Sequence, residues 1–472
     1  MIKNISGAFQ GHEKRVDLRL VIIFMIINLL VMLNAVIHNP EMGYDAEGHL
    51  DYMTTLPAKL PTFGESTEFF SPPLPYFLPS LAYQGCYQIY ADENIVDARN
   101  FDCRKLAGKV AQGINVFLSL GTTYLFLLIA DRLRPGKANF KPIGLGLFGL
   151  LTVYYKTFAQ VRGEPYVAFF CLLAVFFLMA SIQERRLDWK NAVRFGLILG
   201  FLILSRQWGF LVFPAILVWV GLIWLHDRPL GLRLGRFMGL SFAISLLVGG
   251  WFYLYLYSNF GSFTAFNQER QSFSFSNKPL SFYRSTGLAD QQLFKDPLRP
   301  RFDNQFLPSF YSDLWGDYWG FFVYIRDNSY LGLVGLGNRS EMASYLGKVN
   351  LAAVIPSLVL LGGALMGIGS LAKAIFQPKR ADYGVLFDSL LLLIILFSFA
   401  GFLYFVITVP NAVQGDTVKA TYMIQVFVLL PLLGAEFMDR IAMRSPQLQP
   451  LIAISLMLIF IHNLPAMISR YF

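Results

Sequence analysis

The sequence predicts an all-α polytopic membrane protein, and three observations lead to this fold class. The 472 residues are 55% hydrophobic and 15% charged, whereas roughly a quarter of the residues in a soluble chain are charged. The mean hydropathy is positive, at +0.50. Apolar stretches of about 18 or more residues recur along the chain, and each can cross a bilayer core of about 30 Å as a helix.

The net charge of +9 comes from basic residues in short clusters between the apolar runs. This pattern is typical of cytoplasmic loops and argues against a nucleic-acid-binding protein.

The first apolar run, 18–37, is too long for the core of a signal peptide and has no cleavage site after it, so we expect a retained helix. Further spans are predicted at 105–129, 139–157, 165–183, 193–205, 209–225, 237–258, 350–372, 385–408, 420–436 and 449–464, which makes about eleven.

The stretch 73–90, PPLPYFLPSLAYQGCYQI, is apolar but rich in proline, which removes backbone donors that hydrocarbon cannot replace. If this stretch lies on the membrane, five basic loops fall on the side of the N-terminus, with two to four Lys or Arg each. They are 131–141, 183–194, 226–236, 373–382 and 439–444. The positive-inside rule then predicts a cytoplasmic N-terminus and an outer C-terminus.

Two large loops remain on the outer face, 38–104 and 259–349. We expect residues 1–437 to form one transmembrane region with the functional site, and 438–472 to add a C-terminal transmembrane helix. Cys86 and Cys103 share the first outer loop, where a disulfide is permitted, although two free thiols are the expected state. Cys171 is expected to pack inside an apolar run, and the five histidines show no metal-ligand spacing.

An acidic cluster follows the first helix directly, in NPEMGYDAEGHLDYM (39–53). Asp45 and Glu47 lie among aromatic and apolar residues instead of in a polar spacer, and His49 follows them. A carboxylate at a membrane interface beside aromatic rings can have its proton affinity tuned for general-base catalysis. The alternative interpretation is that these acids are simply solvated.

Basic side chains form a second set on the outer face, where the positive-inside rule disfavours them: Arg104, Lys105, Arg162, Arg206, Arg270 and Lys419. Each one alone could be a cation that reaches the lipid headgroups from a helix end. As a group on one face, they are what an anionic lipid phosphate requires, because arginine binds phosphate through two parallel hydrogen bonds.

The aromatic stretch 306–322, FLPSFYSDLWGDYWGFF, offers a surface for a sugar. Trp315 could stack on a sugar ring and Asp313 and Asp317 could bind its hydroxyls; an aromatic belt at the interface is an equal alternative. The two acids also leave open a divalent cation, Mg²⁺ or Mn²⁺, although further ligands are not identifiable. Glu164 is expected to pair with Arg162.

Several of these segments together resemble the GT-C superfamily of polyprenyl-phosphate-sugar glycosyltransferases, which includes protein O-mannosyltransferases and aminoarabinose transferases. GYDAEGHLDYMTTL with SPPLPYFLPSL is similar to the first outer loop of the family, in which an acid precedes a Pro-Pro-Leu helix. The other segments that carry the resemblance are VRGEPYVAFF (161–170), GLILGFLILSRQWGFLVFP (196–214), YLYSNFGSFTAFN (255–267) and GDTVKATYMIQVFVLLP (415–431).

The resemblance implies a GT-C-type fold and a membrane hexosyl- or pentosyltransferase that inverts the anomeric carbon. Asp45 matches the catalytic aspartate of the family; Ala46 replaces the adjacent acid of the mannosyltransferases, so Glu47 matches less well. The donor would be a sugar on a polyprenyl phosphate, and the acceptor a lipid, a polysaccharide or a protein. The implied contacts to the donor phosphate are Arg104, Arg206, Lys419 and Tyr422, and those to the rest of the substrate are His49, Arg162, Glu164, Asp313, Trp315 and Asp317.

Two other function classes stay open. A transporter of lipid-linked sugars would be expected to bury charges at mid-membrane in symmetric halves, and an oligosaccharide-lipid polymerase would be expected to carry paired arginines in its large outer loop.

The length of the chain and the lack of a soluble C-terminal domain favour a bacterial inner membrane with the site on its outer face. The sugar, the acceptor, metal dependence and the oligomeric state are not readable from the sequence.

Overall fold

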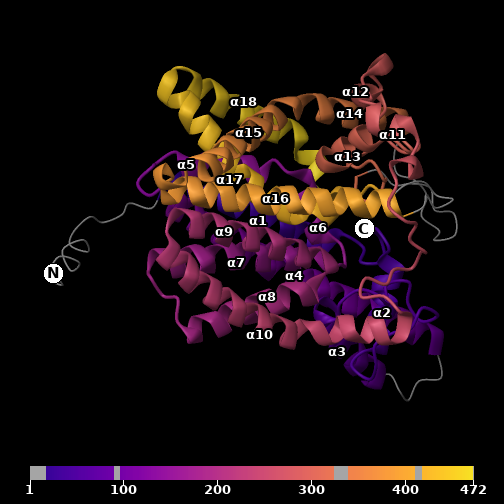
Figure 1. Cartoon of the computed structure of the whole chain (residues 1–472). Coiled ribbons are helices and arrows are strands. Elements are labelled where there is room, and N and C mark those ends of the chain that lie inside the picture. The colour runs from indigo at the N-terminus through magenta and orange to yellow at the C-terminus, as the bar shows by residue number, and fades with distance from the viewer. Residues whose placement is uncertain (1–16, 90–95, 324–338, 410–416, 471–472) are drawn as a thin grey trace.

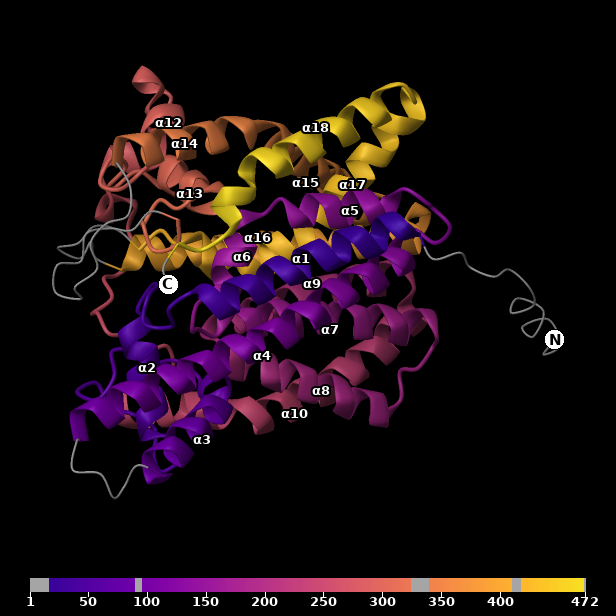
Figure 2. The same cartoon turned by 180° about the vertical axis from the view of Figure 1, so that it is seen from behind.

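The computed structural model of the chain describes residues 17–89, 96–323, 339–409 and 417–470. These residues form helices and connecting segments, with no β-strand among them. Figure 1 shows the long helices side by side along one direction, and Figure 2, from behind, shows α1 (Leu18–Ile37) running along the bundle. The all-α fold class predicted from the sequence is confirmed.

Nine helical segments of the described residues are long and apolar enough to cross a membrane, so the chain is an integral membrane protein. Their main helices are α1, α4 (Val96–Leu133), α7 (Glu164–Gln183), α9 (Val212–His226), α10 (Arg228–Phe260), α15 (Val354–Phe376), α16 (Tyr383–Thr408), α17 (Ile424–Arg444) and α18 (Leu448–Asn463). The predicted number of eleven is not confirmed. The two other predicted spans, 139–157 and 193–205, correspond to a broken helix and to a helix of 17 residues.

The broken helix consists of α5 (Phe140–Gly149) and α6 (Thr152–Ala159), separated by Leu150 and Leu151. Irregular backbone inside a membrane protein requires internal hydrogen-bond partners. Here the break is buried, and the Tyr155 hydroxyl donates to the carbonyl of Gly149 at 2.7 Å. All residues of α6 are buried, and α6 contacts the segments that carry the candidate site described below.

The 17-residue helix α8 (Trp189–Ser205) packs closely along α10. It begins at Asp188, whose side chain accepts a hydrogen bond from the backbone N–H of Asn191 at 3.1 Å. Small residues recur every four positions on the facing sides, which lets two membrane helices approach closely. These residues are Ala192, Gly196 and Gly200 on α8, and Ser241, Ser245 and Gly249 on α10.

Both predicted outer loops place helices at the same end of the bundle, on the right in Figure 1. The first contributes α2 (Ala46–Thr55) and α3 (Leu74–Ile89), and the second contributes α11 (Leu280–Arg284), α12 (Gln292–Lys295), α13 (Phe306–Trp315) and α14 (Arg339–Ala352). The proline-rich stretch contributes α3, which runs from Leu74 to Ile89 and is not among the nine candidate spans of the described residues.

A disulfide joins Cys86 on α3 to Cys103 on α4, with Cα atoms 5.5 Å apart. The expectation of two free thiols was therefore wrong. The spacing along the chain could not decide the pairing, because it depends on how α3 packs against α4. Cys171 is free and buried inside α7, as expected.

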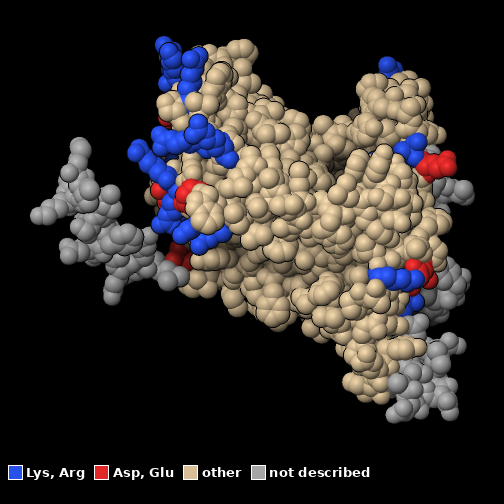
Figure 3. Space-filling view, turned by 60° about the horizontal axis from the view of Figure 1, so that its bottom comes forward, with Lys and Arg blue, Asp and Glu red and all other residues tan. Residues whose placement is uncertain are grey.

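Charged side chains gather at the two ends of the molecule and leave a broad uncharged band between them on the face shown in Figure 3. The larger group of Lys and Arg lies at the end where α1 begins. The loops at that end follow α4, α7, α9, α15 and α17, and they are the five basic loops of the sequence. Hydrocarbon accommodates the uncharged band, and the polar ends meet water and headgroups.

The close approach of α8 and α10 makes a testable prediction. A Cβ atom at Gly196 would lie 2.6 Å from the carbonyl oxygen of Ser241 on α10, so the helices must separate in Gly196→Ala. We expect a loss of about 1–3 kcal/mol in the free energy of unfolding, measured as a lower midpoint of thermal unfolding in detergent. Gly239→Ala on α10 is the control, because nothing lies within 4 Å of the added Cβ. Equal midpoints for the two variants would contradict the close packing.

Candidate active site

An ion pair between Asp45 and Lys419 forms the centre of the candidate site. Asp45 directly precedes α2 in the left-handed conformation, with φ 56°. Lys419 directly precedes the 3₁₀ helix η7 (Ala420–Met423) at the start of α17. The Lys419 Nζ donates to Oδ2 of Asp45 at 2.7 Å, and the Asp45 side chain keeps 34% of its surface exposed. Asp45 is therefore paired and still accessible.

The pairing keeps both groups charged. Burial on its own would raise the pKa of the Asp45 carboxyl, but the Lys419 ammonium outweighs this effect and lowers the pKa to about 2. Burial likewise works against the charged form of Lys419, but the Asp45 carboxylate outweighs it and raises the pKa of Lys419. At neutral pH Asp45 is thus an unprotonated acceptor and Lys419 a full positive charge.

Three aromatic rings surround the Lys419 ammonium. Its Nζ lies 5.3 Å from the ring centre of Tyr44, 5.6 Å from that of Tyr422 and 5.8 Å from that of Trp319. These distances are within the range of cation–π attraction. The rings hold the ammonium at a fixed place beside Asp45 without adding a second negative charge.

A buried network of two arginines and two glutamates lies next to this pair. Arg162 pairs with Glu164 through two hydrogen bonds of 2.7 and 3.1 Å, as expected from the sequence. Arg206 donates to Glu164 at 3.1 Å and to Glu68 at 2.7 Å. All four side chains are at most 4% exposed. Because their charges balance, the network ties the ends of α7 and α8 to the first outer loop without an uncompensated buried charge.

His49 lies inside this network and does not face solvent. Its Nδ1 shares a 2.8 Å hydrogen bond with the Tyr76 hydroxyl, and Oε2 of Glu68 lies 3.7 Å from the same nitrogen. In the described residues, Nε2 of His49 is buried without a hydrogen-bond partner. Burial lowers the pKa of His49 to about 4, against the opposing effect of Glu68. His49 is therefore neutral at physiological pH.

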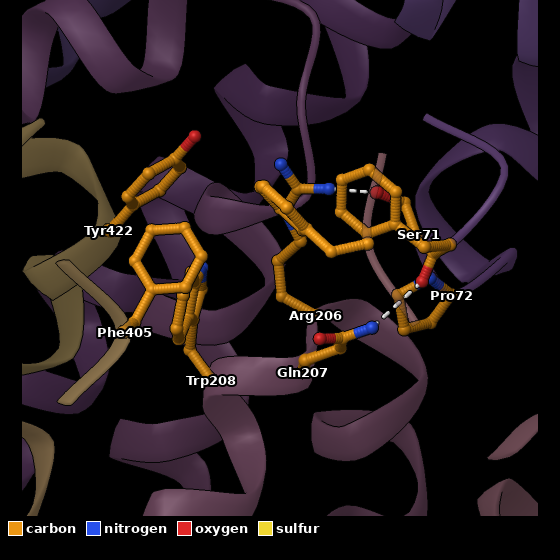
Figure 4. Close-up of a pocket in the computed structure, with 9 residues that line it drawn as sticks. Ser71, Pro72, Arg206, Gln207, Trp208, Phe405 and Tyr422 are labelled. Atoms are coloured by element: carbon orange, nitrogen blue, oxygen red, sulfur yellow. Dashed lines mark hydrogen bonds between the residues drawn. The ribbon is translucent and has the colours of Figure 1, made fainter. Parts of the chain in front are cut away.

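A pocket opens beside Arg206 and Tyr422 (Figure 4). Figure 4 shows Arg206 between Tyr422 and Ser71, whose hydroxyl accepts a hydrogen bond from the guanidinium. Arg162 and Lys419 both lie 5.6 Å from the Tyr422 ring, so this ring connects the pocket to the ion pair. The other lining residues are mainly aromatic or apolar: Phe70, Pro72, Gln207, Trp208, Phe266 and Phe405.

The remaining predicted residues of the first outer loop and of α4 lie on the surface of the site. Arg104, on α4, pairs with Asp51 at 2.9 Å, and both side chains are partly exposed. Asp51 is on α2, six residues after Asp45. Burial raises the pKa of Asp51, and Arg104 opposes that shift. Glu47 is exposed in the first turn of α2.

The three residues predicted to contact a sugar from the second outer loop are all buried. Asp313 and Trp315 are 0% exposed and Asp317 is 1% exposed. Asp317 accepts hydrogen bonds from the backbone N–H groups of Phe321, Phe322 and Val323, at 3.1, 2.9 and 2.7 Å. The polar atoms of Asp313 and Asp317 bond to other groups of the protein, which differs from the exposed sugar surface that was one of the two interpretations of the sequence.

Three further residues at the site were missed in the sequence: Tyr44, Lys156 and Glu68. Lys156 is fully buried on α6 and pairs with Asp313. A signal was available, because a lone lysine inside an apolar run marks a functional or structural polar site. Glu68 is an acid directly before an apolar stretch, and Tyr44 directly precedes Asp45. Neither carries a comparable signal.

Among the described residues, no group of three or more His, Cys, Asp or Glu is placed to hold a metal ion. A divalent cation remains an open expectation for the charged groups of the site.

Comparisons with known proteins find similarity in structure alone. No family model matches the chain, and no curated protein matches it. A solved structure of ArnT from Cupriavidus metallidurans bound to undecaprenyl phosphate is 15% identical, with a TM-score of 0.47 over 93% of this chain and 63% of that chain. An oligosaccharyltransferase from Archaeoglobus fulgidus, in complex with Zn and sulfate, is 14% identical, with a TM-score of 0.49 over 95% and 53%.

A further structure of the archaeal oligosaccharyltransferase AglB holds an inhibitory peptide and a dolichol-phosphate; it is 13% identical, with a TM-score of 0.45 over 95% of this chain and 55% of that chain. These proteins are GT-C glycosyltransferases. The chain thus spans little more than half the length of the oligosaccharyltransferases and 63% of that of ArnT.

The buried neutral histidines predict a pH dependence of stability. Burial lowers the pKa of both His49 and His38 to about 4, from 6.5. Below about pH 6.5 the unfolded chain binds protons that the folded chain does not. The free energy of unfolding should therefore fall by up to about 1.4 kcal/mol per pH unit for each histidine until about pH 4.

The measurement is the midpoint of thermal unfolding in detergent between about pH 7 and about pH 5, for the wild type and for His49→Asn. Asn can replace the hydrogen bond at Nδ1 but does not titrate. We expect a smaller pH dependence in the variant. An unchanged slope would show that His49 is not held neutral in the fold.

Proposed function

We propose that the chain is a membrane glycosyltransferase that moves a sugar from a polyprenyl-phosphate donor to an acceptor at the extracytoplasmic face. The observation that supports it most is the ion pair of Asp45 and Lys419 next to an aromatic pocket, at the end of the bundle opposite the basic loops. Glycosyl transfer from a phosphate needs a base and a positive charge for the leaving phosphate. The partly exposed carboxylate and the ammonium enclosed by aromatic rings can supply them. The resemblance of the sequence to the GT-C superfamily agrees with this proposal.

Lys419 is the residue best placed to receive the donor phosphate. Its side chain is 13% exposed, and its ammonium is surrounded by rings that attract a cation but cannot neutralise it. Tyr422 and Arg206 line the adjoining pocket and supply a hydroxyl and a guanidinium. Arg104, on α4, is partly exposed and contributes positive charge at the surface.

Asp45 acts as the general base in the proposed reaction. The acceptor hydroxyl or amine loses its proton to Asp45 and attacks the anomeric carbon from the side opposite the phosphate. The new glycosidic bond forms as the bond from that carbon to the phosphate oxygen breaks, and its electron pair leaves with the polyprenyl phosphate. A single in-line displacement of this kind inverts the anomeric carbon.

The donor also tunes the base in this mechanism. With Lys419 paired to Asp45, the pKa of the carboxyl is about 2, which makes it a weak base. A phosphate that attracts Lys419 would relieve this effect and raise the proton affinity of Asp45. Asp45 therefore becomes an effective base only when the donor is bound.

The proposed orientation follows from the charges of the two ends. The basic end, where α1 begins, faces the cytoplasm, and the site lies on the periplasmic or outer side. The acceptor can be a lipid, a polysaccharide or a protein. A transporter of lipid-linked sugars remains the second candidate, because a site that binds a lipid phosphate also suits a carrier.

The test of the proposed function compares wild type with Asp45→Asn in detergent, with a lipid extract that contains polyprenyl-phosphate sugars. We expect acceptor-dependent release of free polyprenyl phosphate to slow by at least ~100-fold in the variant, as for a lost general base. Donor binding should persist, because Lys419 remains. Glu65→Gln, at a partly exposed acid of the same outer loop that pairs with Lys59, is the control and should keep wild-type turnover.

Two outcomes would contradict the proposal. Equal turnover in wild type and Asp45→Asn would exclude Asp45 as the base. Binding of the lipid by the wild type without release of polyprenyl phosphate, with any acceptor pool, would favour the transporter.

Lys419→Met gives a separate prediction. The variant removes the positive charge and keeps a side chain of similar length, so we expect the affinity for the donor to fall by about tenfold or more, as for a lost charge-assisted hydrogen bond. The measurement is the donor concentration at half-saturation together with direct binding of radiolabelled donor. Unchanged binding would place the phosphate elsewhere.

A further inference from the structure

The carboxylate of Asp313 joins three segments that are far apart in the sequence. Its Oδ1 accepts a hydrogen bond of 2.5 Å from the Tyr44 hydroxyl and another from Lys156 Nζ, also at 2.5 Å. Its Oδ2 accepts a hydrogen bond of 2.6 Å from the backbone N–H of Ala420. The side chain is 0% exposed. No solvent competes for these bonds, which strengthens them.

Two of these three contacts are to direct neighbours of the ion pair. Tyr44 precedes Asp45, and Ala420 follows Lys419. A single carboxylate thus holds both chain segments of the pair, which are 374 positions apart. The third partner, Lys156, supplies the opposite charge that a buried carboxylate needs, and it also donates to the carbonyl oxygen of Asp313 at 2.7 Å.

The same loop adds a second link to each segment. Trp319 Nε1 donates to the carbonyl oxygen of Val418 at 3.0 Å, on the other side of Lys419. The Trp319 ring meets the Tyr44 ring edge to face, with centres 6.1 Å apart. The second outer loop therefore forms the frame that places the segments of Asp45 and Lys419 relative to each other.

We propose that Asp313 is a positioning residue for glycosyl transfer, which holds the two chain segments that carry Asp45 and Lys419 in fixed places, so that only the two side chains move when the donor phosphate binds. This inference rests on the proposed function. Asp313 does not meet the sugar; it acts through the residues beside the base and beside the phosphate-binding cation. Displacement of a reacting group by about 1 Å can cost on the order of 100-fold in rate, so the fixed place of each segment matters.

An ionised carboxylate suits this position because all of its partners donate. Tyr44, Lys156 and Ala420 bring an O–H, an ammonium and an N–H to two oxygens. An asparagine would turn its amide N–H groups toward at least one of these donors and would leave Lys156 without a counter-charge. The test variant is therefore Asp313→Asn combined with Lys156→Gln, which keeps the site neutral and polar.

The experiment measures kcat/KM for donor-dependent release of polyprenyl phosphate in a double-mutant cycle with Lys419→Met. We expect the Asp313→Asn/Lys156→Gln pair to lower kcat/KM about 10- to 100-fold when Lys419 is present. In the Lys419→Met background the same change should cost less than about threefold, because residues that act as a unit are not additive. Asp290→Asn, at an exposed acid of the same outer loop, is the control and should have little effect.

Equal losses in both backgrounds would overturn the proposal, because Asp313 would then act independently of the pair. No loss in either background would also overturn it. If the combined variant does not fold, Tyr44→Phe removes only one hydroxyl and goes through the same cycle, with an expected loss of about tenfold or less that disappears in Lys419→Met.

Hydrogen–deuterium exchange separates this inference from the proposed function. The Ala420 amide should exchange faster in the Asp313 variant, and this readout needs no turnover. Unchanged exchange at Ala420 would overturn the positioning role. Absence of donor-dependent release from the wild type would overturn the proposed function instead.

Discussion

The ion pair of Asp45 and Lys419 joins two segments 374 positions apart in the sequence, and the end of the bundle that carries α2 and α13 is arranged around it. A partly buried charge without a partner is costly. Here each charge is compensated by the other, and the ammonium is further held by three aromatic rings. The pair keeps the carboxylate ionised and accessible, so one interaction serves both the stability and the chemistry of the site.

The helical fold supports this pair through buried charged side chains whose net charge is zero. The network of Arg162, Glu164, Arg206 and Glu68 fixes the ends of α7 and α8 against the first outer loop. The break between α5 and α6 places Lys156 in the interior, where it pairs with Asp313. Breaking a buried pair leaves an uncompensated charge, so the network resists displacement of the segments that carry the site.

The sequence predicted the parts of this arrangement that depend on local pattern. The apolar runs and the pairing of Arg162 with Glu164 follow from residues close together in the chain. What the sequence could not predict depends on tertiary contacts. The burial of Asp313 arises because Tyr44, Lys156 and Ala420 meet there, and the disulfide arises from the packing of α3 on α4.

The central claim is that the donor phosphate replaces Asp45 as the partner of the Lys419 ammonium. The most direct test is a structure of the protein with a polyprenyl phosphonate sugar that cannot react. The account predicts the phosphonate next to Lys419 Nζ, and Asp45 Oδ2 beyond hydrogen-bond distance from that nitrogen, against 2.7 Å without donor. A phosphonate bound elsewhere, with the Asp45–Lys419 pair intact, would contradict it.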